Sequence, residues 1–328
     1  MAVILVGIYS PFAAWNIPAA HVERLRAEFP GHSFLHAADD TEAAELIASA
    51  DIAFMSEVRP NQFAAGPHLK WIHSPAAGIG GMLFPAMLES PVVMSNSRGI
   101  SANTIAEHVI AMTLAMFRKF PQAVRSQAAR EWAQDAIMHG SPIRMIGGSH
   151  ILIVGLGSIG GATARRFAAL GAEVTGIRRN LSRPVPEGVS AVHPPEALAT
   201  ALAAADVVVL SAPQTNGTRG LIGAAELAGM KSDALLVNVS RGKLVDENAL
   251  IAALRNGTVG GAALDVFEHE PLAADSPLWD MPNVLITPHM SGFRPDHWDA
   301  VTDLFADNLH RFLKGDPLLN VVDKQAGY

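Results

Sequence analysis

The stretch Ile151-Leu-Ile-Val154-Gly155-Leu-Gly157-Ser-Ile-Gly160 decides the fold of this chain. Its four apolar residues predict a buried strand. Residues 158–170 predict a helix that is closed by Gly171. In such a turn the first glycine allows a tight bend, the second lets a pyrophosphate approach the backbone, and the third lets the helix pack against the strand. The motif therefore predicts a dinucleotide-binding βαβ unit, in which the cofactor contacts are Gly155, Leu156, Gly157, Ser158, Ile159 and Gly160.

Strand-like and helix-like stretches alternate on both sides of this turn. Further strands are expected at residues 3–8, 51–55, 69–73, 173–177, 206–210, 234–239, 260–265 and 284–286. Helices are expected at residues 21–29, 101–120 and 296–313, with Thr104 and Glu107 as a capping box and Pro121 as a stop for the second of them. This alternation of strands and helices predicts an α/β fold with doubly wound parallel sheets.

The composition excludes several classes of protein. The chain has 328 residues, of which 49% are hydrophobic and 17% charged, so it has enough apolar material for large cores. Its net charge of −7 argues against a nucleic-acid partner. The absence of cysteine excludes disulfides, a thiolate nucleophile and cysteine-ligated metal. No apolar run approaches the ~18 residues of a membrane span, and the first residues lack a basic leader, so we expect a cytoplasmic protein without a membrane partner.

The end of the second strand of the βαβ unit indicates which dinucleotide binds. Proteins that bind NAD usually place an Asp or Glu there, on the ribose 2′-hydroxyl. This chain has Arg178 and Arg179 instead, and an arginine fork suits a 2′-phosphate. The sequence therefore predicts NADP(H) as the preferred cofactor, with NAD as a weaker one.

Three polar residues, Arg241, Glu270 and His289, follow three successive predicted strands. Because parallel strands end at the same edge of a sheet, we expect these side chains to converge. Arg241 can bind a carboxylate and a keto oxygen, His289 can donate a proton near neutral pH, and Glu270 can orient the imidazolium and keep it charged. A metal site built from Asp265, Glu270 and His289 is the alternative, but the chain has no H-E-x-x-H motif, and we expect no metal.

The chain resembles the D-2-hydroxyacid dehydrogenase family in seven segments that follow the family's order. These are Leu69-Lys-Trp-Ile-His-Ser-Pro-Ala-Ala-Gly78, Gly155-Leu-Gly-Ser-Ile-Gly160, Pro213-Gln-Thr-Asn-Gly-Thr-Arg-Gly-Leu-Ile222, Asn238-Val-Ser-Arg-Gly242, Ala263-Leu-Asp-Val-Phe267, Glu270-Pro271 and Pro288-His289. The chain departs from the family at two positions. Many members have Asp where this chain has Gly80, and NAD-using members have Asp where it has Arg178. Among the subgroups it looks most like the NADPH-dependent glyoxylate and hydroxypyruvate reductases.

The resemblance implies a flavodoxin-like substrate domain made of residues 1–100 and 293–328, with a Rossmann cofactor domain, residues 101–292, inserted into it. It assigns catalysis to Arg241, Glu270 and His289, and substrate binding to Ala77, Gly78, Arg241 and His289. It adds Pro213, Thr218, Val239, Arg241, Asp265 and His289 to the cofactor contacts. The implied reaction is hydride transfer from NADPH to a small 2-keto acid of the glyoxylate and hydroxypyruvate class, which gives a D-2-hydroxy acid.

Two other functions are compatible with parts of this pattern. A formate dehydrogenase of the same fold would pair its histidine with Gln, whereas this chain has Glu270. A nucleotide-sensing binding protein of the same fold would retain the catalytic residues, so only an activity assay separates it from an enzyme. The apolar helix expected over residues 104–117 and the family together predict a homodimer.

Overall fold

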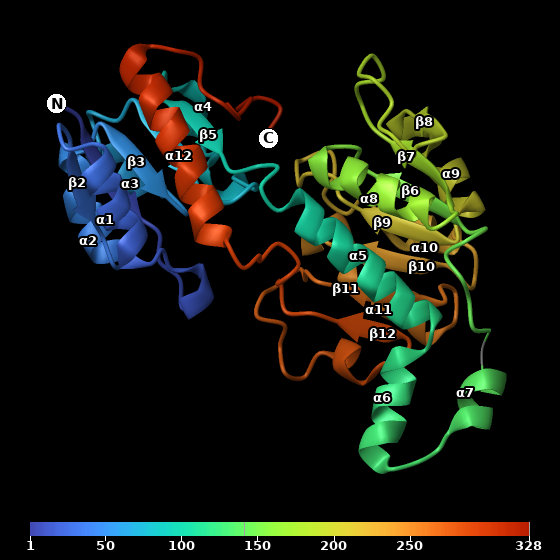
Figure 1. Cartoon of the computed structure of the whole chain (residues 1–328). Helices are drawn as coiled ribbons and strands as arrows, with labels where there is room; N and C mark the ends of the chain where they lie inside the picture. The colour runs from blue at the N-terminus through green and yellow to red at the C-terminus, as the bar shows by residue number, and fades with distance from the viewer. Residues whose placement is uncertain (141, 328) are drawn as a thin grey trace. The chain divides into compact units, whose positions relative to one another are not determined.

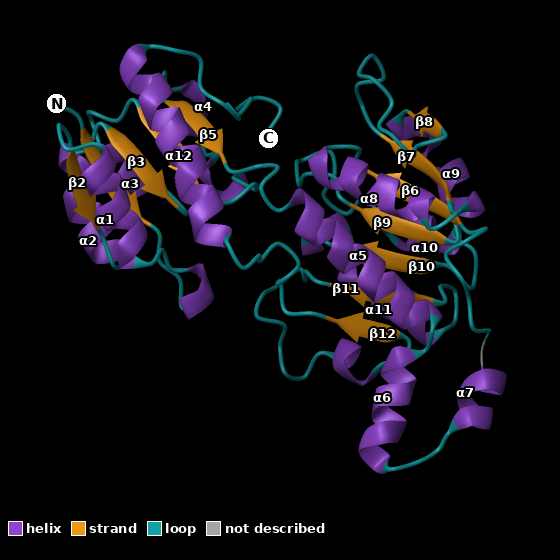
Figure 2. Cartoon of the chain, viewed as in Figure 1, coloured by secondary structure: helices purple, strands orange, loops and turns teal. Residues whose placement is uncertain are grey.

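The computed structural model describes residues 1–140 and 142–327. The chain forms two compact units, Met1–Ile100 with Arg294–Tyr328, and Ser101–Phe293. Each unit contains one sheet whose paired strands are all parallel, and helices surround the sheet (Figures 1 and 2). This architecture confirms the α/β fold with two doubly wound parallel sheets that the sequence predicts.

The first unit has a five-stranded sheet in the order β2-β1-β3-β4-β5, which is the flavodoxin-like order. Its strands are β1 (Val3–Gly7), β2 (Ser33–His36), β3 (Ile52–Met55), β4 (Trp71–Ser74) and β5 (Val93–Asn96). Its helices are α1 (Ala19–Glu28), α2 (Asp40–Leu46), α3 (Pro60–Ala65), α4 (Pro85–Glu89) and α12 (His297–Lys314), with short 3-10 turns at Ala13–Trp15, Ile47–Ser49 and Gly80–Met82.

The last helix of the chain packs on the first sheet. Phe305 of α12 stacks on Phe54 of β3, with ring centroids 4.1 Å apart. Val301 and Leu309, one turn to either side, are fully buried in the same core as Phe54. This 3.6-residue spacing is the one that predicted the helix from the sequence, and it joins residues near the C-terminus to the first 100 residues.

The second unit has a seven-stranded sheet in the order β12-β11-β10-β9-β6-β7-β8, a Rossmann order with one added strand. Its strands are β6 (His150–Val154), β7 (Glu173–Ile177), β8 (Ala191–His193), β9 (Val207–Leu210), β10 (Leu235–Asn238), β11 (Gly261–Leu264) and β12 (Val284–Ile286). Its helices are α5 (Ala102–Phe117), α6 (Phe120–Ala129), α7 (Gln134–Gly140), α8 (Ser158–Ala169), α9 (Leu198–Ala204), α10 (Ala224–Ala228) and α11 (Glu247–Arg255), with 3-10 turns at Pro195–Ala197, Gly242–Leu244 and Pro277–Asp280.

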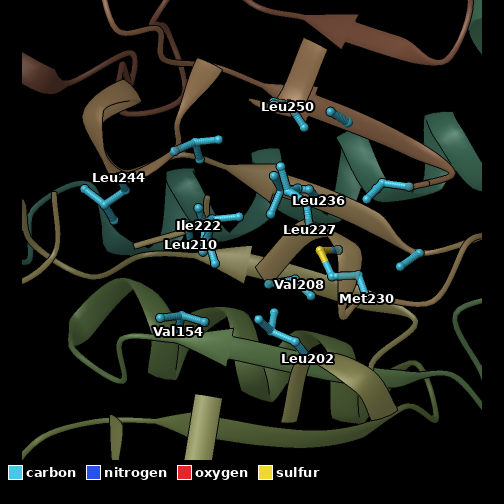
Figure 3. Packing of buried hydrophobic residues seen from close by; sticks show 14 of the residues in the cluster. Val154, Leu202, Val208, Leu210, Ile222, Leu227, Met230, Leu236, Leu244 and Leu250 are labelled. Atoms are coloured by element: carbon cyan, nitrogen blue, oxygen red, sulfur yellow. The ribbon is translucent and has the colours of Figure 1, made fainter. Parts of the chain in front are cut away.

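Strand β6 shows how this sheet forms a core on each face. Ile151 and Ile153 pack in a cluster with residues of α5 and α8, whereas Leu152 and Val154 pack in a second cluster with residues of α9 to α11. Figure 3 shows part of this second cluster around Val154, Val208 and Leu236. Successive side chains of a strand point to opposite faces, so a continuous apolar run fills both cores.

Several predicted helix boundaries are wrong. Helix α5 ends at Phe117, three residues before the expected end, and Pro121 lies in the first turn of α6 rather than stopping a helix. Lys119, between the two helices, has a φ of 61°. The expected capping box is also wrong, because Ser101 is the N-cap and Glu107 instead forms an ion pair with Arg166, at 3.1 Å.

The strands that the sequence did not predict are β2, β5 and β8, and each lies at an edge of its sheet. An edge strand is covered less completely than a central one, so it carries a weaker apolar signal. Within the described part of the chain, every helix is too short or too polar to cross a lipid bilayer.

Candidate active site

The glycine-rich turn between β6 and α8 packs closely against its own chain at two of its three glycines. Gly155 has a φ of +102°, and a Cβ placed there would lie 2.5 Å from the backbone nitrogen of Ala212. A Cβ on Gly160 would lie 2.1 Å from the carbonyl oxygen of Gly155. A Cβ on Gly157 would meet no atom of the described chain within 4 Å. Thus Gly155 and Gly160 shape the turn, and Gly157 leaves its outer side open.

This open side lies at the beginning of α8, a helix of 12 residues. Gly157 is the N-cap, and a glycine has no side chain to bond the N–H groups of the first helical turn. Those N–H groups and the helix dipole favour an anion such as a pyrophosphate. Ser158 is exposed and Ile159 is half-buried, so these two predicted cofactor contacts border the open side of Gly157. The turn therefore fits a dinucleotide.

Gly176 also shapes this region, although it is not among the residues that the sequence predicted for the site. A Cβ on Gly176, inside β7, would lie 2.4 Å from Cδ1 of Leu156, so this glycine lets the buried Leu156 side chain pack beneath the turn. A glycine inside a strand pattern signals such a close approach, and that signal was available.

Arg178 and Arg179 follow directly after β7. The backbone N–H of Arg178 donates to the carbonyl of His193, and its guanidinium donates to the carbonyls of Arg183 and Pro184, the latter at 3.0 Å. Arg178 is half-buried and Arg179 is exposed. The structure thus places Arg178 at the predicted strand end and tethers it to the following loop.

A second turn at the same edge of the sheet follows β9. The hydroxyl of Thr218 donates to the carbonyl of Pro213, at 2.7 Å, and accepts from the N–H of Thr215, at 2.8 Å. Val239, next to β9 at the end of β10, is buried. Pro213, Thr218 and Val239 are therefore all at the carboxyl edge, where the sequence predicted cofactor contacts.

Arg241 lies three residues beyond β10, and neighbouring residues hold its backbone in place. The side-chain amide of Asn238 donates to the Arg241 carbonyl, at 3.1 Å. A Cβ on Gly242 would lie 1.8 Å from the carbonyl carbon of Phe267, so only glycine allows this segment to pack against the chain that follows β11. This close packing brings Arg241 into the neighbourhood of Glu270.

Glu270 and His289 form a direct pair. Nδ1 of His289 lies 2.6 Å from Oε2 of Glu270, and Oε1 accepts a hydrogen bond of 3.0 Å from the N–H of Phe267. The side chain of His289 is 46% exposed and that of Glu270 is 34% exposed, so a small molecule can reach both. Because Nδ1 faces the carboxylate, Nε2 is the imidazole nitrogen that can face a substrate.

The electrostatics of the site keep both Arg241 and Glu270 charged. Burial lowers the pKa of Arg241 from its ordinary value, and the Glu270 carboxylate opposes that change. Burial favours the neutral form of Glu270, but the hydrogen bonds from His289 and Phe267 and the charges of His289 and Arg241 outweigh it and hold the pKa of Glu270 below its ordinary value. A carboxylate is therefore available to the imidazole across the neutral range.

Asp265 follows β11 directly and is fully buried. Its carboxylate accepts hydrogen bonds from the hydroxyl of Thr287, at 2.6 Å, and from the N–H groups of Met290, at 2.9 Å, and Ser291, at 3.0 Å. Asp265 thus holds the segment that carries His289. The expected cofactor contact of Asp265 stays a prediction.

The remaining predicted site residues lie in the other unit. Ala77 and Gly78 are exposed and follow β4, where the Ala77 carbonyl accepts a hydrogen bond of 2.6 Å from the side chain of Asn96. Among residues 1–140 and 142–327, no group of three or more acidic or histidine side chains is arranged to hold a metal ion.

Residues 110–291 match the family model described as "D-isomer specific 2-hydroxyacid dehydrogenase, NAD binding domain". This chain belongs to the D-isomer specific 2-hydroxyacid dehydrogenase family. The resemblance found in the sequence motifs is thereby confirmed, and the chain is an NAD(P)-dependent 2-hydroxyacid dehydrogenase.

Three relatives illustrate the similarity. The chain is 33% identical over 291 residues to a glycerate dehydrogenase of Methylorubrum extorquens, covering 86% of this chain and 88% of the relative. A family member of Xanthobacter autotrophicus, solved with NADPH and MES, is 31% identical with a TM-score of 0.84, over 100% of this chain and 99% of that one. An NADPH-dependent glyoxylate/hydroxypyruvate reductase of Sinorhizobium meliloti, solved with NADP and sulfate, is 29% identical with a TM-score of 0.84, over 100% of both chains.

The glycine turn yields a prediction that separates folding from cofactor binding. Gly160→Ala should lower the free energy of unfolding by about 1–3 kcal/mol, because the new methyl group collides with the backbone. Gly157→Ala should cost less than about 1 kcal/mol, since its methyl group meets no protein atom. It should nevertheless weaken NADPH binding at least about tenfold, because the methyl group occupies the side on which a pyrophosphate approaches.

Urea unfolding and fluorescence titration with NADPH measure the two effects. Undiminished NADPH binding by Gly157→Ala would show that the pyrophosphate does not lie against this turn.

Proposed function

We propose that this dehydrogenase reduces a small 2-keto acid of the glyoxylate and hydroxypyruvate class to the D-2-hydroxy acid, with NADPH as the preferred cofactor. The observation that carries the proposal is the 2.6 Å contact between His289 and Glu270, at the sheet edge that also holds Arg241 and the glycine turn. This edge combines a cation, a proton donor and a dinucleotide-binding turn in one unit.

Arg241 is the cation of this proposal. A guanidinium stays charged at all relevant pH values and binds carboxylate and carbonyl oxygens through paired N–H groups. Its Nη1 donates to the Ser240 carbonyl, at 2.7 Å, which orients the guanidinium and leaves other N–H groups for a substrate. Arg241 would thus bind the keto acid and polarise its keto group.

His289 is the proton donor. NADPH held at the glycine turn would supply the hydride that the carbonyl carbon accepts. Nε2 of His289 would give its proton to the carbonyl oxygen as the alcohol forms. Glu270 keeps the Nδ1 proton of the imidazolium hydrogen-bonded and compensates its charge. In the reverse direction the neutral imidazole accepts the proton of the hydroxy acid.

In the first unit, we infer that backbone N–H groups of Ala77 and Gly78 bind the substrate carboxylate. The preference for glyoxylate and hydroxypyruvate rests on the resemblance and on the Sinorhizobium meliloti relative. Oxidation of NADPH with a panel of 2-keto acids tests it, and an absence of turnover with every acid would favour the nucleotide-sensing alternative.

The proton-transfer assignment predicts opposite pH dependences for the two directions. Reduction uses a proton of His289, and oxidation of the hydroxy acid returns one to it. Reduction should therefore be supported at lower pH and fall as the pH rises through the neutral range, whereas oxidation should rise over the same range. Glu270 stays ionised in this range, because its pKa is lowered. Glu270→Gln should therefore move the fall in reduction to lower pH, since a neutral amide no longer stabilises the imidazolium.

His289→Ala should lower kcat by about 10²–10⁴, the usual contribution of a general acid. The exposed His68 of the other unit provides a matched control, and His68→Ala should retain full turnover. Steady-state rates across pH measure both effects. Near-normal turnover of His289→Ala, or an unmoved pH profile for Glu270→Gln, would contradict the assignment.

The cofactor proposal rests on Arg178 and Arg179. We expect NADPH to exceed NADH at least about tenfold in kcat/KM, because a charge-assisted hydrogen bond to a 2′-phosphate is worth about 1.5–3 kcal/mol. Arg178→Asp and Arg179→Asp should each reduce this ratio, whereas Arg255→Asp, at the exposed end of α11, should not. Equal use of both cofactors by the unaltered enzyme would refute the preference.

Helices α6 and α7, and not α5 as the sequence suggested, are the segments through which we expect a homodimer to form. The apolar side of α5 is largely buried within its own unit, with Val109, Met112 and Phe117 in the core. Large apolar side chains are instead exposed on α6, on α7 and in the segments beside them, namely Phe120, Val124, Trp132, Met138, Ile143 and Met145. Figure 1 shows α6 and α7 beyond the sheet of this unit. Several large apolar side chains left exposed on neighbouring segments are typical of a protein interface.

In solution we expect a mass of about twice 34.6 kDa. A variant with Phe120→Glu and Val124→Glu should have half that mass, because two buried charges oppose association. Val185→Glu, at an exposed position away from these helices, should leave the mass unchanged. Light scattering after gel filtration measures the mass of each protein. If the unaltered chain has the mass of a monomer, the dimer is refuted.

A further inference from the structure

Three side chains from three elements form a hydrogen-bonded chain next to the segment that carries His289. His108 lies on α5, Thr287 follows β12, and Asp265 follows β11. Nε2 of His108 lies 3.0 Å from the hydroxyl oxygen of Thr287, which lies 2.6 Å from Oδ1 of Asp265. Neither His108 nor Thr287 is among the site residues that the sequence predicts.

The geometry fixes the direction of these hydrogen bonds. An ionised carboxylate only accepts, so the hydroxyl of Thr287 donates its single proton to Asp265. The hydroxyl oxygen must then accept from His108, which requires a proton on Nε2. Burial lowers the pKa of His108, and the nearby Asp265 carboxylate opposes this. His108 is therefore a neutral donor at neutral pH.

This chain of hydrogen bonds ends on the backbone around His289. The Asp265 carboxylate also accepts from the N–H groups of Met290 and Ser291, and the Asp265 carbonyl accepts from the N–H of His289, at 2.8 Å. His289 has a φ of 50°, a conformation that non-glycine residues seldom adopt and that the surrounding structure must hold. The contacts of Asp265 supply that restraint on both sides of His289.

We propose that His108 is a positioning residue for His289, acting through Thr287 and Asp265 to keep Nδ1 of His289 on Glu270 and its Nε2 directed at the substrate. The inference rests on the proposed function in one respect, because it takes His289 to be the proton donor. It adds a residue of α5, far away in the sequence, to the machinery of proton transfer. His108 itself exchanges no proton with the substrate.

Paired variants distinguish a hydrogen-bond donor from a space-filling side chain. His108→Leu removes the donor, whereas His108→Gln places an amide N–H the same number of bonds from Cα as Nε2. Thr287→Val and Thr287→Ser form the second pair, in which only Ser keeps the hydroxyl. His150→Leu is the matched control, because His150 makes a similar contact of 2.9 Å with Thr175, at the opposite end of the sheet.

We expect His108→Leu and Thr287→Val each to lower kcat about 10-fold or more, since small misplacement of a catalytic group is costly. The Kd for NADPH should change by a smaller factor than kcat, because the glycine turn, which would hold the pyrophosphate, is untouched. His108→Gln and Thr287→Ser should recover most of kcat, and His150→Leu should keep it. The double variant His108→Leu/Thr287→Val should be no slower than the slower single variant, because both break one chain of interactions.

A readout that needs no turnover completes the experiment. In ¹⁵N-histidine NMR spectra, with His289→Ala to assign the signal, the Nδ1 resonance of His289 reports its hydrogen bond to Glu270. His108→Leu should change this resonance, and His108→Gln and His150→Leu should leave it as in the unaltered protein. An unchanged resonance in His108→Leu, or equal loss of kcat in His108→Gln and His108→Leu, would overturn the inference. If the resonance shifts as expected while no 2-keto acid is reduced, the proposed function fails and the positioning role stands.

Discussion

All seven strands of the larger sheet run in the same direction, and this constraint places the candidate site. Parallel strands bring their carboxyl ends to one edge, so Arg241, Glu270 and His289 meet although they are far apart in the sequence. The meeting also needs close backbone packing between neighbouring strand ends. Gly242 permits it, because any side chain there would overlap the backbone at Phe267. Strand direction thus selects the edge, and one glycine brings the cation within range of the carboxylate.

Charge balance explains why polar groups can be concentrated at this edge. Asp265 is fully buried, and a buried carboxylate is tolerated only when hydrogen bonds compensate for the loss of water. Here three donors from one short segment provide the compensation, so the same bonds that stabilise the charge also hold that segment in place. Glu270 has a different environment. It remains partly exposed, and its negative charge is stabilised by interactions with His289 and Arg241. One carboxylate therefore organises the backbone, and the other remains available to the imidazole.

The glycines of the cofactor turn have separate physical roles. Gly155 and Gly160 are required by the chain's own packing, since a side chain at each would overlap backbone atoms, whereas Gly176 makes room for the Leu156 side chain. Gly157 faces open space and has no such requirement within the described structure. A glycine without a packing reason, at the beginning of a helix, is best explained by a ligand that approaches the backbone. This contrast supports a cofactor-binding role for the turn, independently of the motif.

The residues alone were sufficient for the fold class, for the alternation of strands and helices on both sides of the glycine turn, and for the segments that follow the strands. Periodicity and glycine spacing are local properties of a chain. They did not locate the edge strands β2, β5 and β8, whose partial cover leaves a weak apolar pattern, or the break between α5 and α6 at Lys119. Nor did they connect His108 with Thr287, which are on different elements and carry no motif. Such contacts depend on how a helix packs on a sheet, and packing is a property of the folded chain. The sequence thus nominates the candidate polar groups at the strand ends, whereas their hydrogen-bond partners and orientation arise only when the elements come together in space.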